Sequence, residues 1–138
     1  MPTIAEAVRD DGRFTTLITL LNLVGLVATL DGPRPFTVFA PTDDAFAGLP
    51  AGTLDALLRD NVQLKLVLTR HIVAGAMMAA NLASLTSVKT VEGDDLTINA
   101  DPGAHGAIHI DDATVIQRDI KADNGVVHVI DTVLTGDG

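Results

Sequence analysis

The spacing of apolar residues changes near the middle of the chain. In the first half, apolar side chains recur every three or four positions, the spacing of one face of an α-helix. Beyond about residue 86 they alternate with polar side chains, which is typical of strands. Because the helical segments come first and the strands then follow one another, the pattern predicts an α+β fold with hairpins rather than alternating parallel β–α units.

Capping signals divide the helical half into short helices. Thr3 and Glu6 have the spacing of a capping box, so we expect a helix from this point to about Gly12. A second helix should begin after Arg13 and end at Gly25. Its apolar face is formed by Phe14, Leu17, Ile18, Leu21 and Val24.

Further helices and the strands follow from the same signals. Residues 26–30 should form a short helical turn, and residues 77–85 a short alanine-rich helix. Thr53 and Asn61 are predicted to cap one helix each, because their side chains can accept from backbone N–H groups. Strands are predicted over residues 36–40, 72–73, 87–91, 96–100, 107–110, 114–116 and 126–134.

Residues 36–46, Phe-Thr-Val-Phe-Ala-Pro-Thr-Asp-Asp-Ala-Phe, join a strand directly to a helix. Pro41 lacks an N–H group and should end the strand, and the Thr42 hydroxyl can then cap the helix. Asp43 and Asp44 would lie at the positive end of the helix dipole. These features are folding information rather than catalytic chemistry.

Residues 124–134, Asn-Gly-Val-Val-His-Val-Ile-Asp-Thr-Val-Leu, join a turn to a long apolar strand. Asn124-Gly125 is a dipeptide typical of tight turns between strands. The two segments together should supply much of the core. The side chains expected there are Phe36, Val38, Phe39, Phe46, Val127, Val129 and Ile130.

The two segments together resemble the signature segments of the fasciclin-like domain family, and the resemblance extends over nearly the whole chain. It implies a twisted β-sandwich or wedge with several short helices packed against it. We expect one domain over residues 1–138, with an ordered core of about residues 3–134. The signature residues expected to have structural roles are Phe39, Pro41, Thr42, Asn124, Gly125 and His128.

Two short motifs are candidates for partner binding. Residues 68–75 resemble the family's central segment, in which a Tyr-His pair is linked to adhesion, but here Arg70 stands before His71. Asp119-Ile120 matches an Asp-Ile dipeptide that adhesive family members are thought to offer to integrins. The resemblance therefore implies partner-binding roles for Arg70, His71, Asp119 and Ile120.

Each of these motifs also has a structural interpretation. His71 and His128 lie among apolar residues, where a histidine is usually buried and hydrogen-bonded to a carbonyl or to a hydroxyl such as that of Thr42 or Thr69. Ile120 could pack inward while the residue before it caps a turn.

Charge and composition exclude several classes of protein. Eighteen acidic residues against nine basic ones give a net charge of −9, which repels nucleic-acid phosphates and anionic lipid surfaces. Tyrosine and tryptophan are absent, so few side chains could stack on bases. Zero cysteines exclude disulfides and thiol chemistry. No apolar run is long enough for direct insertion into a membrane.

No catalytic or metal-binding constellation stands out. Ser84 and Ser87 are the only serines, and neither lies in a Gly-x-Ser-x-Gly motif. His105 and His109 are four positions apart, but the nearby glycines indicate a turn and a strand rather than a helix. We therefore expect no enzymatic activity, no metal and no cofactor.

The resemblance implies a non-enzymatic adhesion or protein-interaction module that is secreted, periplasmic or on the cell surface. A monomer that binds a cell-surface or matrix protein, or a glycan, is expected. The start of the chain lacks the features of a signal peptide, so either the protein stays in the cytoplasm or a leader was removed; the resemblance favours removal. The alternative function is a carrier that holds a small apolar ligand between sheet and helices, lined by Met77 and Met78.

Overall fold

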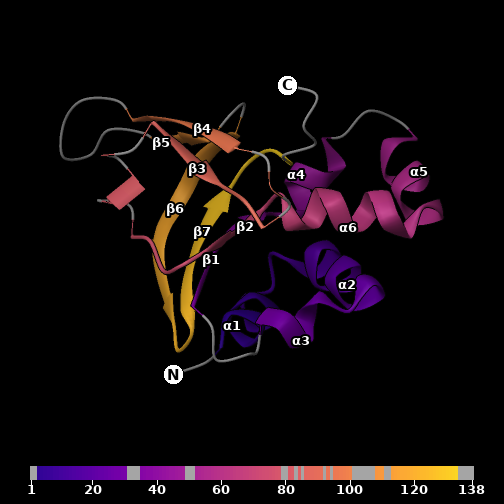
Figure 1. Cartoon of the computed structure of the whole chain (residues 1–138). Helices are drawn as coiled ribbons and strands as arrows, with labels where there is room; N and C mark the ends of the chain where they lie inside the picture. Colours follow the sequence, from indigo (N-terminus) through magenta and orange to yellow (C-terminus); the bar gives the residue numbers. More distant parts are fainter. Residues whose placement is uncertain are drawn as a thin grey trace.

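A computed structural model describes residues 3–30, 35–48, 52–78, 81–82, 84, 86–91, 93, 95–100, 108–110 and 113–133. The helices are α1 (Ile4–Asp11), α2 (Thr15–Val24), α3 (Leu26–Leu30), α4 (Asp43–Ala47), α5 (Thr53–Arg59) and α6 (Asn61–Thr69). The strands are β1 (Phe36–Pro41), β2 (Ile72–Ala74), β3 (Ser87–Lys89), β4 (Asp95–Ala100), β5 (Ile108–Ile110), β6 (Ala113–Ala122) and β7 (Gly125–Ile130). Figure 1 shows the helices gathered on one side of a twisted sheet, which confirms the predicted α+β class.

The strands form one sheet in the order β2-β1-β7-β6-β5-β4-β3. The β1–β7 pair is parallel, and the other pairs are antiparallel. The two ends of the sheet meet, because Val73 forms a bridge with Thr90 and the Val91 N–H donates to the Ile72 carbonyl at 2.8 Å. The sheet is therefore curled almost into a barrel. The two signature strands, β1 and β7, each have a neighbouring strand on both sides.

Two groups of buried side chains form the core. One lies between the helices and the sheet and includes Phe36, Val38, Phe46, Val127 and Val129. The other is formed almost entirely by strand residues and includes Phe39 and Ile130. All seven side chains predicted to be in the core are buried. Because β1 and β7 contribute to both groups, these two strands separate the helical core from the core inside the curled sheet.

The helix ends agree with the sequence at four places and differ at two. The Thr3–Glu6 capping box, the end of α1 at Gly12, the end of α2 at Gly25 and the Thr42 cap of α4 are confirmed. The predicted caps Thr53 and Asn61 are wrong: each is the first residue of its helix.

The residues just before these two helices take the cap positions instead. Gly52 precedes α5 with φ of 85°, and no side chain caps that helix. The Asp60 carboxylate caps α6 by accepting from the N–H groups of Val62 and Gln63 at 3.1 and 3.2 Å. A carboxylate is a stronger acceptor than the amide that follows it, which explains the shift by one residue.

Several strand boundaries also differ from the sequence prediction. β1 includes Pro41, whose Cα lies opposite Ile130, so the strand ends one residue later than expected. β6 runs over Ala113–Ala122 instead of 114–116. Its pairing with β7 is irregular, so apolar and polar residues do not alternate regularly along it. β7 ends at Ile130. Of the expected helix over 77–85, Asn81 and Leu82 are helical, Met77 and Met78 are not, and residues 79–80, 83 and 85 lie outside the described residues.

The Asn124-Gly125 turn binds three segments that lie within the first 36 residues of the chain. The Asn124 side chain accepts from the Ile4 N–H at 2.9 Å and donates to the Leu30 carbonyl. Its backbone carbonyl accepts from the Phe36 N–H at 3.1 Å. Gly125 packs so closely on β1 that an added Cβ would lie 1.9 Å from the Phe36 carbonyl oxygen. The turn thereby fixes the starts of α1 and β1 and the end of α3.

We expect Gly125→Ala to lower the free energy of unfolding by at least about 3 kcal/mol, because β1 and β7 must separate to admit the methyl group. Urea denaturation measures this loss. Gly12→Ala is the matched control. Gly12 also has a positive φ, of 89°, but has open space around it, so this substitution should lower the free energy of unfolding by only about 1–2 kcal/mol. Equal losses for the two variants would contradict the close approach of the strands.

Candidate functional site

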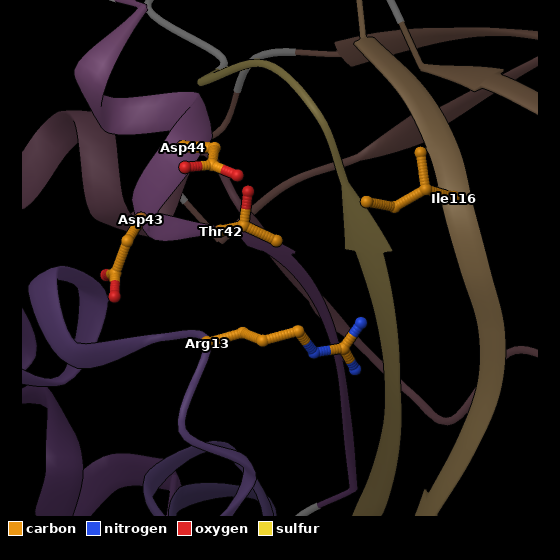
Figure 2. A pocket seen from close by; sticks show the side chains of 5 residues that line it. All are labelled: Arg13, Thr42, Asp43, Asp44 and Ile116. Atoms are coloured by element: carbon orange, nitrogen blue, oxygen red, sulfur yellow. The ribbon is translucent and has the colours of Figure 1, made fainter.

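A pocket of about 350 Å³ opens beside the first signature segment. Its lining residues come from three places in the chain: the segment between α1 and α2, the start of α4, and the middle of β6 (Figure 2). They are Arg13, Thr42, Asp43, Asp44 and Ile116. One wall of the pocket is therefore made by the segment that the sequence singled out, and the opposite wall is a strand from the last part of the chain.

Asp43 holds the start of α2 against the start of α4. Its backbone N–H donates to the Arg13 carbonyl at 2.8 Å, and its carboxylate accepts from the Thr16 N–H at 2.7 Å. Phe14, at the cap position of α2, makes no side-chain cap bond, so Asp43 serves as the cap from a distant helix. The sequence suggested only a dipole role for Asp43 within its own helix, because this partner is distant in the chain.

The electrostatics of Asp43 fit this role. Burial would raise the pKa of its carboxyl, but hydrogen bonds from Thr16 and Thr15 outweigh burial, and the pKa lies below its ordinary value. Asp43 is therefore ionised at neutral pH, as a cap for α2 requires. The neighbouring Asp44 is exposed at the pocket.

Arg13 is fixed by contacts on both sides. Its Nε and Nη2 donate to the two carboxylate oxygens of Asp11 at 2.5 and 2.9 Å, and Nη2 also donates to Gln117 Oε1 at 2.8 Å. The guanidinium lies 5.5 Å from the centroid of the Phe14 ring. The hydrogen bond from Arg13 is the main reason that the pKa of Asp11 is lowered, and the same bond raises the pKa of Arg13. Arg13 thus connects the helices to β6.

β6 is irregular where it borders the pocket. Val115 lies opposite Ile130, Gln117 opposite Val129 and Ile120 opposite Val127, so β6 contains two more residues than β7 over this stretch. As a result Ile116 and Gln117, although adjacent, are both exposed, and 54% of the Ile116 surface is accessible. This exposure could not be predicted from the sequence, because Thr114–Ile116 fits a regular alternating strand.

The Asp119-Ile120 motif lies within β6 rather than in a turn. Ile120 is half-buried and packs against the helical core, while β6 continues to Ala122. The irregular register next to this motif is a backbone feature that the sequence did not reveal. A partner-binding role for Asp119 and Ile120 stays a prediction.

Arg70 and His71 lie where α6 ends and β2 begins. The His71 side chain is 1% exposed, and its Nδ1 lies 2.8 Å from the Val67 carbonyl oxygen. Because a carbonyl can only accept, Nδ1 carries the proton. Burial lowers the pKa of His71 to about 4; the Val67 carbonyl partly opposes this shift, and the Arg70 charge adds to it. His71 is thus a neutral core residue, and Arg70 is half-buried beside it.

His128 likewise has a structural place, inside the curled sheet. It is fully buried, and its Nε2 lies 2.7 Å from the Met77 carbonyl oxygen. Its ring stacks on the Phe39 ring, with 5.9 Å between the two ring centroids. Thr37 on the adjacent strand binds the same segment, donating to the Gly75 carbonyl at 2.6 Å and accepting from the Met77 N–H at 2.8 Å. The two strands therefore hold residues 75–77 in place.

The other histidines do not form a metal site in the part of the chain that the structure describes. His109 lies in β5 with its Nδ1 3.2 Å from the Thr114 hydroxyl, and His105 is outside the described residues. Within the described ranges, no cluster of three or more histidine or acidic side chains has the arrangement needed to hold a metal ion. The described helices also include none with the length and apolar character needed to cross a membrane.

Comparison with known proteins adds three findings. A family model described as "Fasciclin domain" matches residues 12–136. The chain is 47% identical to "Uncharacterized protein sll1735" of Synechocystis sp. over 134 residues, covering 97% of this chain and 98% of that protein. It is 35% identical to "Cell surface glycolipoprotein MPB83" of Mycobacterium bovis over 136 residues, covering 95% of this chain and 59% of that protein.

The fold has a counterpart among solved structures. A structure described as a "FAS1 Domain Pair from the Insect Cell Adhesion Molecule Fasciclin I" aligns with a TM-score of 0.74 and 24% identity. The alignment covers 91% of this chain and 46% of that one. This likeness confirms the wedge-like α+β architecture expected from the sequence.

We predict that Asp43→Ala lowers the free energy of unfolding by about 1–2 kcal/mol at pH 7, because the first turn of α2 loses its acceptor. Asp43→Asn keeps an oxygen acceptor and should recover most of this loss. Since the folded pKa of Asp43 is lowered, the advantage of wild type over Asp43→Asn should be present above pH 3.8 and disappear as the pH falls below it. Urea denaturation at pH 7 and pH 3 measures both effects. Equal stability of Asp43→Ala and wild type at pH 7 would refute the cap.

His71 should make the stability of the fold depend on pH. Between pH 6.5 and about 4 the unfolded chain binds a proton on His71 that the folded protein cannot accept, so stability decreases as the pH falls. The contribution should reach roughly 3 kcal/mol. His71→Asn keeps an N–H donor near the Val67 carbonyl and cannot titrate, so the wild type should lose more stability than this variant between pH 7 and pH 4.5. The same pH dependence in both proteins would show that His71 is not the group responsible.

Proposed function

The chain belongs to the fasciclin domain family, and we propose that it is a non-enzymatic adhesion module that binds another protein at the cell envelope or outside the cell. The observation that carries the proposal is the exposed, irregular stretch of β6 beside the pocket at Arg13 and Asp44. The printed descriptions of two similar proteins, a cell-surface glycolipoprotein and an insect cell adhesion molecule, support an extracellular role.

The surface around the pocket has the physical character of a recognition site. Ile116 provides an exposed aliphatic side chain, and a large aliphatic group exposed at a concave place gains free energy when a partner covers it. Polar groups surround it, among them the Asp44 carboxylate and the Gln117 amide. An apolar centre within a polar rim is the usual anatomy of a protein–protein contact.

Contacts within the protein hold part of this surface in place before any partner binds. Arg13 is held by Asp11 and Gln117, and Asp43 is held by the start of α2. A rigid surface loses less conformational entropy on binding than a flexible one. We call the residues Arg13, Thr42, Asp44, Ile116 and Gln117 the β6 surface.

Charge favours a partner segment that carries positive charge. The whole chain has a net charge of −9, and Asp11, Asp43 and Asp44 lie near the guanidinium of Arg13. A cell-surface or matrix protein with a basic residue next to an aliphatic one would complement the β6 surface. Salt should weaken such binding because it screens the attraction.

The motifs identified in the sequence belong to the same proposal. Asp119 and Ile120 follow the β6 surface along the same strand, so a partner seated there could extend to them. Arg70 is on a different element, and the buried His71 can influence a partner only through the position of its neighbours. We propose a secreted, periplasmic or surface location and a monomeric state.

The carrier function remains the second proposal, but its site would have to open first. Met77 packs against the core inside the sheet, and its backbone is tied to Thr37 and His128. A small apolar ligand at Met77 would therefore have to displace packed side chains. A thermal-shift screen with lipid extracts tests this function, since a carrier should gain stability from one ligand class.

The adhesion proposal can be tested by measuring attachment of domain-coated beads to envelope or matrix preparations at low and physiological salt. We expect the double variant Asp44→Ala, Ile116→Ser to reduce attachment at least tenfold without lowering the melting temperature, since both side chains are exposed. The matched control is Asp55→Ala, Val62→Ser, which removes one exposed acid and one exposed aliphatic from α5 and α6.

The outcomes separate the possibilities. Loss of attachment in the first variant alone places the contact at the β6 surface. Equal losses in both variants would indicate non-specific adsorption, and unchanged attachment in both would move the contact elsewhere. In the last case Asp119→Ala and Arg70→Ala are the next variants. If wild-type beads attach to nothing, the adhesion proposal is wrong.

A further inference from the structure

Asn124 is the only asparagine of the chain that is followed by glycine. In an Asn-Gly pair the backbone nitrogen of the glycine can attack the side-chain carbonyl of the asparagine, because no glycine side chain hinders its approach. The N–H proton leaves to solvent, a bond forms between nitrogen and Cγ, and the side-chain nitrogen departs as ammonia. Water then opens the cyclic imide at either carbonyl, which produces aspartate or isoaspartate without any oxidation or reduction.

We infer that Asn124 is a latent deamidation site that the folded protein protects, and that its modification marks chains that have been unfolded. Both ends of its side-chain amide are engaged in the fold: Oδ1 accepts from the Ile4 N–H at 2.9 Å, and Nδ2 donates to the Leu30 carbonyl. Cyclisation must break both hydrogen bonds to rotate the amide toward the next residue.

The attacking nitrogen is restrained as well. Gly125 is the first residue of β7 and lies opposite Ala122 of β6 on one side and Phe36 of β1 on the other. An added Cβ at this position would meet the Phe36 carbonyl oxygen at 1.9 Å, so Gly125 is packed closely against β1 and has little room to shift. The folded structure therefore hinders both reacting groups.

The products do not fit the site that protects the asparagine. Aspartate at position 124 has no N–H to donate, so a carboxylate oxygen would face the Leu30 carbonyl oxygen. Isoaspartate adds a methylene group to the backbone where the Asn124 carbonyl accepts from the Phe36 N–H. Either product weakens the junction between α1, α3 and β1, so a chain modified while unfolded refolds into a less stable protein.

The experiment follows modification at position 124 by peptide mass spectrometry during incubation at pH 8 and 37 °C in increasing urea. The exchange of ammonia for water changes the peptide mass, and chromatography separates the aspartate and isoaspartate forms. The other asparagines, Asn22, Asn61, Asn81 and Asn99, precede larger residues and are internal controls.

We expect the logarithm of the modification rate at Asn124 to increase linearly with urea, with the slope of global unfolding, until it reaches the rate in the unfolded chain. The native rate should be at least a hundredfold below that limit. A native rate within a few-fold of the unfolded rate, or one that does not change with urea, would overturn the inference, because the turn would then react without unfolding.

The stability of the product provides the second test. Asn124→Asp has the same structure as the aspartate product, and its unfolding midpoint in urea should be lower than that of wild type. If this variant does not fold at all, the isoaspartate form separated from an incubated sample should give a lower refolded yield than the unmodified protein. A deamidated protein as stable as the unmodified one would overturn the claim that the modification marks the chain.

Discussion

The parallel pairing of β1 with β7 is the contact on which most of the structure depends. It aligns residues 36–41 with residues 125–130, so it joins two segments that are 89 positions apart in the chain. Bringing two such distant segments together lowers the conformational entropy of the chain. Burial of apolar side chains on both faces of these strands offsets this loss. Val38 and Val129 pack toward the helices, whereas Phe39 and Ile130 pack inside the sheet. Loss of the β1–β7 pairing would therefore disrupt the packing of both groups of buried side chains.

The pocket depends on the same pairing. Pro41 ends β1 opposite Ile130, and the next residues begin α4, so the position of β7 determines where Thr42, Asp43 and Asp44 lie. Asp43 in turn holds the start of α2, which carries Arg13 toward β6. The shape of the surface is therefore set by backbone contacts in the core, and its chemistry can vary through a few exposed side chains without altering the fold.

The sequence predicted those features that depend on local chemistry. The capping box at Thr3, the cap at Thr42 and the turn at Asn124 each rely on residues within a few positions, and all three are present in the structure. The caps of α5 and α6 were misplaced by one residue because two suitable residues adjoin each other. The contact of Asp43 with Thr16 and the exposure of Ile116 depend on partners in distant segments and on the register of β6, for which a single sequence has no signal.

The meeting of the two sheet ends, through Val73, Thr90 and Val91, has a consequence for a protein that binds others. A free edge strand offers backbone N–H and C=O groups to any extended chain and invites indiscriminate strand addition and aggregation. Here backbone groups of β2 pair with those of Thr90 and Val91, the two residues that follow β3. At this place the backbone is already paired, so a contact there would rely on side chains rather than on strand addition.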